Sequence, residues 1–169
     1  MNAAVNPQLI TLPSLRDAMR QVAGGVSVIT AGIGEERTGL TATSAVSLSV
    51  DPPTMIVCVN RAASAWPVMR RHRHFCVNVL AEHHQPVADR FAGRGGVKGP
   101  ARYDEADWQV LATGALALDG ALASVDCEIE EFIDRHSHSI IIGAVRAVRV
   151  NPGRPLVYAQ GGYGGFNAA

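Results

Sequence analysis

Short apolar segments, separated by turns rich in glycine and proline, constrain this chain more than any other feature of its sequence. The 169 residues include 17 Gly and 9 Pro. Segments that are rich in Val and Ile, alternate in polarity or stay apolar, and end at such turns are typical of β-strands. The segments with this character are residues 25–32, 40–50, 54–60, 74–81, 121–134, 138–150 and 155–164. Many short strands with few helices predict a mainly β fold, a small barrel with peripheral α-helices.

Helical spacing of apolar residues marks three other segments, residues 14–23, 64–72 and 85–93. Ser14 and Ser64 stand where N-caps are preferred. No repeat, low-complexity stretch or linker divides the chain. We therefore expect residues 1–13 to form a flexible N-terminal leader and residues 14–169 to form a single domain.

The charge balance and the lack of long apolar runs exclude several classes of protein. Acidic and basic residues number 15 each, so the chain lacks the basic surplus of a typical nucleic-acid-binding domain. No run approaches the roughly 18 apolar residues of a transmembrane helix, and the N-terminus lacks a secretion signal. The cysteines form no CxxC pair and are predicted to be buried free thiols: Cys58, Cys76 and Cys127. We expect a cytoplasmic protein that binds neither nucleic acid nor membrane.

Hydroxyl groups are concentrated in one predicted strand, residues 40–50. Its members are Thr41, Thr43, Ser44, Ser47 and Ser49. Such hydroxyls could simply face solvent on an edge strand. Alternatively, small side chains would let the backbone approach a flat ligand, and hydroxyl and N–H groups would bind its heteroatoms.

The segment Asn60–Ser64, "NRAAS", lies between a predicted buried strand and a predicted helix. N–H groups at a helix N-terminus favour phosphate, and Arg61 and Ser64 could add hydrogen bonds. The plainer interpretation is an ordinary helix cap with a solvated arginine.

The spacing of the histidines does not predict a metal site. His136 and His138 are spaced as on one face of a strand, but no third ligand lies nearby at a standard spacing, so we expect no metal site. His138 could lie at a pocket mouth or simply at a strand end. The histidines of residues 70–74 and 83–84 are predicted to be solvated. Residues 93–107 form the one extended irregular stretch, which is typical of a functional or mobile loop.

The order of these segments resembles the short-chain flavin reductase family, the reductase components of two-component flavin-dependent monooxygenases. The resemblance covers about residues 14–166. It rests on "LRDAMRQVAGGVSVIT", "GLTATSAVSLSVDPPTMIVCVNRAAS", "HFCVNVLAEHHQPVADRFAG" and "PLVYAQGGYGGF". No GxGxxG fingerprint is present, so any nicotinamide would bind without a Rossmann fold. The resemblance implies an antiparallel, Greek-key-like split β-barrel that forms a homodimer, with flavin at or near the dimer interface.

The resemblance also implies roles for individual residues. Those expected along the isoalloxazine and ribityl chain are Thr41, Ala42, Thr43, Ser44 and Ser47. Those expected near the phosphate are Asn60, Arg61, Ala63 and Ser64. Weaker candidates for an adenine moiety are Phe91, Arg94 and Lys98. His138 matches the family histidine at the nicotinamide position, although the Gly-Asp pair usual before that histidine is replaced here by His136-Ser137.

The implied function is an NAD(P)H:flavin oxidoreductase. It would transfer hydride from the C4 atom of NADH or NADPH to the N5 atom of FMN or FAD and supply reduced flavin to an oxygenase component. Two alternatives remain at this point. One is an FMN-containing reductase of a non-flavin acceptor such as a corrinoid, and the other is a non-catalytic flavin-binding protein.

Overall fold

The computed structural model describes residues 12–166, with side chains from residue 15 onward. The predicted flexible leader, residues 1–13, therefore lies outside the described residues apart from its last two. None of the helices within the described range has the length and apolar character needed to span a bilayer.

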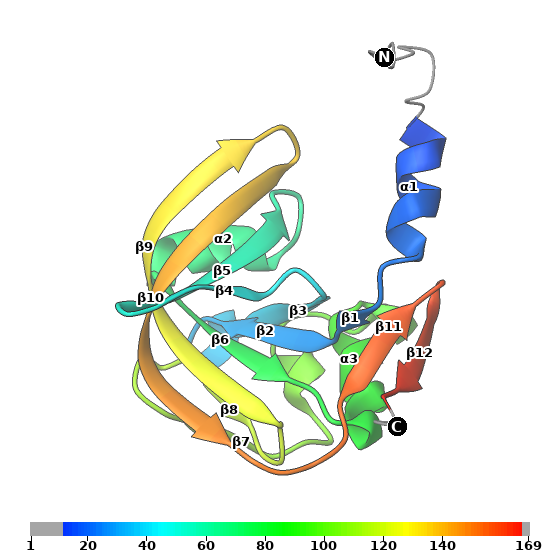
Figure 1. The fold of residues 1–169 in the computed structure, drawn as a ribbon. Helices are drawn as coiled ribbons and strands as arrows, with labels where there is room; N and C mark the ends of the chain where they lie inside the picture. The colour runs from blue at the N-terminus through cyan, green and yellow to red at the C-terminus, as the bar shows by residue number, and fades with distance from the viewer. Residues whose placement is uncertain (1–11, 167–169) are drawn as a thin grey trace.

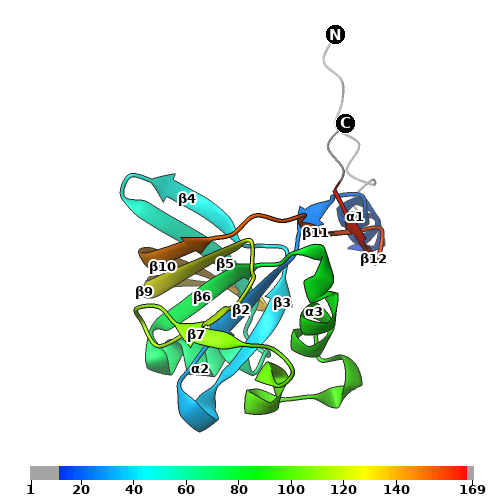
Figure 2. The same cartoon turned by 90° about the horizontal axis from the view of Figure 1, so that it is seen from below.

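The main sheet is antiparallel and has its strands in the order β3-β2-β6-β9-β10-β5-β4. Its strands are β2 Ser27–Ala31, β3 Thr38–Ala42, β4 Val46–Val50, β5 Pro53–Asn60, β6 His74–Val79, β9 Ala123–Arg135 and β10 His138–Val150. The two edge strands, β3 and β4, are consecutive in the chain and only residues 43–45 separate them. The sheet must therefore curl until its edges approach each other, and it forms a partly closed barrel (Figures 1 and 2).

Smaller elements surround this barrel. The remaining strands are β1 Gly24–Gly25, β7 Trp108–Val110, β8 Leu116–Leu118, β11 Leu156–Ala159 and β12 Gly162–Gly165. The α-helices are α1 Leu12–Arg20, α2 Ala65–His72 and α3 Gln85–Phe91. Short 3-10 turns are η2 Gly34–Glu36, η3 Glu82–His84, η4 Arg94–Gly96 and η5 Gly99–Tyr103. The predicted mainly β, antiparallel fold with a few peripheral helices is confirmed.

Two predicted strands are each divided in two. Residues 40–50 do not form one strand, because the chain leaves β3 after Ala42 and enters β4 at Val46, on the opposite edge of the sheet. Residues 155–164 do not form one strand either. They turn back at Gln160 and Gly161, both with positive φ, and β11 pairs with β12 as a hairpin. Alternating polarity does not reveal a change of pairing partner, so the sequence pattern missed both breaks.

The start of one helix and the cap of another differ from prediction. Helix α1 begins at Leu12, so Ser14 lies inside it. Ser64 precedes α2 but its hydroxyl caps no backbone N–H group; it lies 3.3 Å from the Thr38 hydroxyl instead. Helix α1 stands away from the barrel in Figure 1; its apolar side chains Leu15 and Met19 are exposed, as is Val22 just after the helix.

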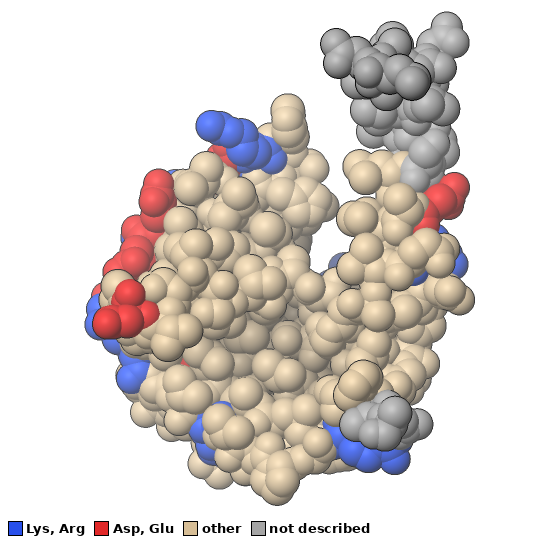
Figure 3. All heavy atoms as spheres, in the orientation of Figure 1, with Lys and Arg blue, Asp and Glu red and all other residues tan. Residues whose placement is uncertain are grey.

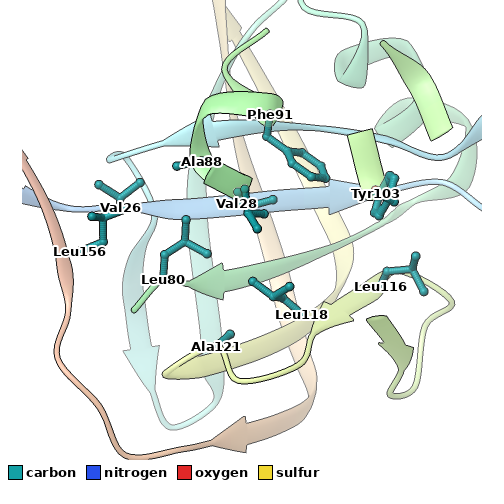
Figure 4. Close-up of a cluster of buried hydrophobic side chains, with 11 residues drawn as sticks. Val26, Val28, Leu80, Ala88, Phe91, Tyr103, Leu116, Leu118, Ala121 and Leu156 are labelled. Carbon is teal, nitrogen blue, oxygen red and sulfur yellow. The ribbon is translucent and has the colours of Figure 1, made fainter. Parts of the chain in front are cut away.

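One core cluster lies between the sheet, α3 and the loop before β7 (Figure 4). Phe91 packs edge-on against Tyr103, with ring centroids 5.1 Å apart, and Trp108 completes the aromatic group. The Tyr103 hydroxyl donates a hydrogen bond of 2.6 Å to the Thr38 carbonyl. Residues 93–107 are thus anchored in the core by Tyr103, although the sequence favoured a functional or mobile loop.

Two of the histidines predicted to be solvated are buried, His74 and His84. The backbone N–H of Ala81 donates to His84 Nδ1 at 3.2 Å, and burial lowers the pKa of His84 to about 4. Burial also lowers the pKa of His74. Cys76 and Cys127 are buried free thiols as predicted, whereas Cys58 is only partly buried.

Candidate functional site

A cavity of about 250 Å³ lies where β3, the end of α3 and the β11–β12 hairpin meet. Its lining residues are Val26, Thr41, Ala42, Thr43, Ala92, Arg94, Tyr158 and Tyr163. Figure 3 shows this face hollowed between the barrel and the segment of α1 and β11–β12, with few charged side chains around the hollow. The structure thus brings together four predicted site residues, Thr41, Ala42, Thr43 and Arg94.

Two tyrosines form an aromatic corner of this cavity that the sequence did not identify. Tyr158 and Tyr163 pack edge-on with ring centroids 5.3 Å apart. The Arg94 guanidinium lies 5.5 Å from the Tyr163 centroid and forms an ion pair with Asp89 at 2.9 Å. Burial and the nearby Asp89 carboxylate raise the pKa of Tyr163, so this phenol stays neutral at physiological pH. A hairpin assignment for residues 155–165 would have revealed the pair, because Tyr158 and Tyr163 are directly opposite in the β11–β12 register.

The hydroxyl groups of residues 41–47 differ in whether they already form hydrogen bonds within the protein. Thr41 Oγ1 donates to the Ala88 carbonyl at 2.6 Å, and Ser44 Oγ donates to the Cys58 carbonyl at 3.1 Å. These two hydroxyls fasten β3 to α3 and the β3–β4 connection to β5. Ser47 Oγ donates only to Ser49 within its own exposed strand. The Thr43 hydroxyl has no hydrogen-bond partner among residues 12–166 and borders the cavity. Thr43 is therefore the hydroxyl best placed to meet a ligand.

Small residues shape the wall behind Thr43. A Cβ atom added at Gly24 would lie 3.1 Å from the Thr43 Cβ. Gly24 pairs with Tyr158 in the register of β1 and β11. The glycine therefore lets β1 pass close behind the cavity wall, which a larger side chain would push toward the cavity.

The other predicted residues form a second group at the tips of β5 and β10. His138 lies opposite Asn60 in the β5–β10 register. The Arg61 backbone N–H donates to the Ser137 carbonyl at 2.9 Å, and its guanidinium donates to the His136 carbonyl at 3.2 Å. His138 is exposed, and its Nδ1 lies 2.9 Å from the Ser137 hydroxyl. None of Asn60, Arg61 and His138 lines the cavity, so the predicted residues divide between two places.

The remaining candidates are scattered. Ala63 and Ser64 lie just before α2, beside the second group. Phe91 lies in the core with its ring packed on Tyr103 and Trp108, so we leave it out of the proposed site. Lys98 is exposed in the loop that follows α3. No group of three or more metal-binding side chains gathers within the described residues.

Comparisons with known proteins identify the family to which this architecture belongs. The sequence profile described as flavin reductase like domain matches residues 19–167. The chain is 40% identical over 158 residues to the FMN reductase (NADH) RutF 2 of Methylorubrum extorquens, covering 91% of this chain and 89% of that protein.

Solved structures agree with the sequence relatives. The flavin reductase component BorF of a bacterial two-component tryptophan halogenase superposes with a TM-score of 0.85 at 34% identity, over 94% of this chain and 100% of that one. The NADH:FAD oxidoreductase SgcE6 of Streptomyces globisporus, solved in complex with NAD and FAD fragments, gives a TM-score of 0.83 at 28% identity, over 98% of both chains. A profile match over nearly the whole chain and a relative at 40% identity lead to one conclusion: this chain belongs to the flavin reductase like domain family.

Proposed function

We propose that this protein is an NADH-dependent flavin reductase that releases reduced flavin to a separate flavin-dependent enzyme. The observation that carries this proposal is the cavity where Thr41 and Thr43 meet Tyr158, Tyr163 and Arg94. The sequence relatives support it, because RutF 2 is named an FMN reductase that uses NADH and SgcE6 an NADH:FAD oxidoreductase. FMN or FAD and NADH are therefore the cofactors we assign to this chain.

The donor set of the cavity suits a flavin. Flat aromatic ligands favour tyrosine rings and small side chains, and their heteroatoms need a few hydrogen-bond donors. Tyr158 and Tyr163 supply the rings, Ala42 and Ala92 leave room, and Thr43 offers a free hydroxyl. When bound, flavin and nicotinamide supply the redox chemistry, a hydride passing from C4 of the nicotinamide to N5 of the flavin.

The chain contributes position and electrostatics. The cavity wall would hold the flavin and exclude water, while Ser44 and Ser47 continue the polar surface away from the cavity toward β4. The residues just before α2 are assigned to the phosphate: Asn60, Arg61, Ala63 and Ser64. The N–H groups at the N-terminus of α2 and the positive charge of Arg61 would attract a phosphate. His138, on the neighbouring strand tip, would orient the nicotinamide amide or ribose by hydrogen bonding. Arg94 at the cavity and the exposed Lys98 in the loop after α3 are the residues we assign to an adenine moiety.

We also propose that the working form is a homodimer. The cavity of about 250 Å³ is smaller than the roughly 300–1,000 Å³ of sites that enclose small ligands, so a flavin nucleotide needs a further wall. Apolar side chains in two regions are exposed in the described part of the chain: Leu15 and Met19 on α1 with Val22 just after it, and Val46, Leu48 and Val50 on β4. A second copy would cover such surfaces and supply that wall.

The recipient of reduced flavin follows from the relatives. BorF is the reductase of a two-component halogenase, and the family resemblance includes reductases of monooxygenases. An oxygen-using, flavin-dependent partner is therefore the class of enzyme we propose for this chain. The free thiols Cys58, Cys76 and Cys127 support a reducing compartment such as the cytoplasm.

The deciding experiment is anaerobic stopped-flow mixing of protein and FMN with NADH, followed at the flavin absorbance. Rapid bleaching at a rate that depends on protein concentration is expected, and repeating the reaction with FAD and NADPH sets both preferences. Flavin that binds yet stays oxidised would contradict the reductase and leave a flavin-binding protein. Light scattering at the same protein concentration tests the dimer.

A further inference from the structure

The hairpin tip that carries His138 is anchored by a chain of side-chain hydrogen bonds to α2. Trp66, in the first turn of α2, donates its indole N–H to the Ser139 hydroxyl at 2.8 Å. The Ser139 hydroxyl in turn donates to the Asp134 carboxylate. Asp134 lies near the end of β9 and opposite Ser139 in the β9–β10 register. The chain therefore links α2, β10 and β9, whose arrangement Figure 1 shows beside the tip of β5.

The direction of these hydrogen bonds is fixed by chemistry. An indole N–H only donates, and an ionised carboxylate only accepts. The Ser139 hydroxyl between them has one proton, so it must accept from Trp66 and donate to Asp134. Ser139 is fully buried, so water cannot replace either partner easily. The hydrogen bonds thus select one rotamer of Ser139.

The anchor itself is held from outside by two arginines. The guanidinium carbons of Arg70 and Arg61 lie 5.1 and 5.7 Å from the centroid of the Trp66 ring. Arg70 also lies 3.9 Å from the Asp134 carboxylate. The cation–π contacts stabilise the position of the indole from which its N–H reaches Ser139.

Consecutive residues of a strand point to opposite faces of the sheet. Ser139 points inward to Trp66 and Asp134, so His138 must point outward, where it is exposed. A slip of one residue at the tip would turn the His138 side chain to the other face. Fixing Ser139 therefore fixes the face on which His138 stands.

We propose that Trp66 and Ser139 are positioning residues for the nicotinamide, acting through His138. This inference rests on the proposed function for its kinetic consequence. The consequence is selective for the Ser139 hydroxyl: its loss should weaken productive nicotinamide binding and leave flavin binding unchanged. The cavity lies on β3, α3 and β11–β12, and Ser139 forms its hydrogen bonds with Trp66 and Asp134 rather than with the residues assigned to the phosphate.

The test compares Ser139→Ala and Trp66→Phe with Ser139→Thr, which keeps the hydroxyl on a β-compatible side chain. Ser139→Ala and Trp66→Phe are expected to raise the KM for NADH about tenfold, the effect of one hydrogen bond, with kcat within twofold of the wild type. The flavin Kd should stay within twofold of the wild type in Ser139→Ala, which leaves the Trp66 ring beside Arg61 in place. Ser139→Thr is expected to restore most of the NADH affinity.

Ser124→Ala is the matched control. Ser124 lies on β9, is as fully buried as Ser139, and forms a hydrogen bond of 2.9 Å with Asn78 Oδ1 far from the tip. Ser124→Ala should lower the stability of the fold while leaving the KM for NADH unchanged. An equal rise in KM in this variant, or none in Ser139→Ala, would overturn the proposal.

Amide hydrogen exchange gives a readout that does not depend on activity. Residues 135–139 should exchange faster in Ser139→Ala and Trp66→Phe than in the wild type and in Ser124→Ala. Unchanged exchange at the tip would reject the anchor. If the wild type fails to oxidise NADH, the proposed function fails, and the exchange data still decide whether Ser139 holds the tip.

Discussion

The Arg94 guanidinium carbon lies 5.5 Å from the centroid of the Tyr163 ring, at the wall of the cavity. This contact joins the loop after α3 to the β11–β12 hairpin, and Tyr158 packs edge-on against Tyr163. Arg94 and the two tyrosines come from parts of the sequence that no local pattern connects. They make the cavity wall a stacking surface with a positive charge beside it.

Replacement of Tyr163 by Ala is therefore expected to weaken flavin binding about fivefold, because an aromatic contact contributes about 1 kcal/mol beyond the buried area. The Kd for FMN, measured by fluorescence quenching, is the observable. Tyr163→Phe keeps the ring and should bind within twofold of the wild type. Equal losses in both variants would point to the hydroxyl instead of the ring face.

His138→Ala should raise the KM for NADH about tenfold while the flavin Kd stays constant, because the residue lies outside the cavity and on the predicted nicotinamide side. His136→Gly is the control, since it removes a neighbouring imidazole at a position whose φ of +49° suits glycine. Steady-state kinetics with saturating FMN measure both variants. Loss of flavin binding in His138→Ala would contradict the assigned role.

Replacement by Val should affect stability at Thr41 and flavin binding at Thr43. Thr41→Val removes the 2.6 Å hydrogen bond to the Ala88 carbonyl, so the free energy of unfolding should fall by about 1 kcal/mol. Thr43→Val removes a hydroxyl without a partner in the described residues, so stability should change by less than about 0.5 kcal/mol while flavin binding weakens. Urea unfolding and flavin titration separate the two effects; the reverse pattern would refute the assignment of Thr43 to the ligand.

Stability should decrease in mild acid because of buried histidines. The pKa of His84 is about 4 in the folded protein, below the ordinary 6.5 of an exposed imidazole. Between pH 4 and pH 6.5 the imidazole of His84 is protonated in the unfolded chain but not in the folded chain. The contribution of His84 to the free energy of unfolding is therefore complete above pH 6.5 and is lost as the pH falls toward 4. The lowered pKa of His74 acts in the same direction.

Urea unfolding at pH 7 and pH 5 measures this effect. His84→Asn keeps an acceptor for the Ala81 N–H but does not titrate, so it should lose less stability than the wild type between the two pH values. The same loss in both proteins would mean that other groups cause the acid sensitivity.

Much of the molecule could be predicted from the sequence because its signals are local. The apolar segments at 54–60, 74–81 and 138–150 became β5, β6 and β10 with nearly the expected bounds. The two-residue turn at Asp51-Pro52 ended β4 as the sequence suggested. The predictions were wrong where one local sequence pattern is compatible with two structures. The sequence around His74 does not show whether its side chain is buried or exposed, and a divided strand has the same alternation of polarity as a continuous one.

The sequence by itself determined most of the long strands, the approximate extents of the helices, the hydroxyl-rich segment and the family, because periodicity, turn residues and motif order are properties of neighbouring residues. Only the tertiary structure decided that β3 and β4 occupy opposite edges of one sheet, that the Thr41 and Ser44 hydroxyls bind the protein's own carbonyls, and that Tyr158 and Tyr163 face Thr43 across a cavity. These relations depend on which strands pair and how far the sheet curls. The free energy of pairing is summed over contacts distant in the chain, and no short stretch of sequence contains it.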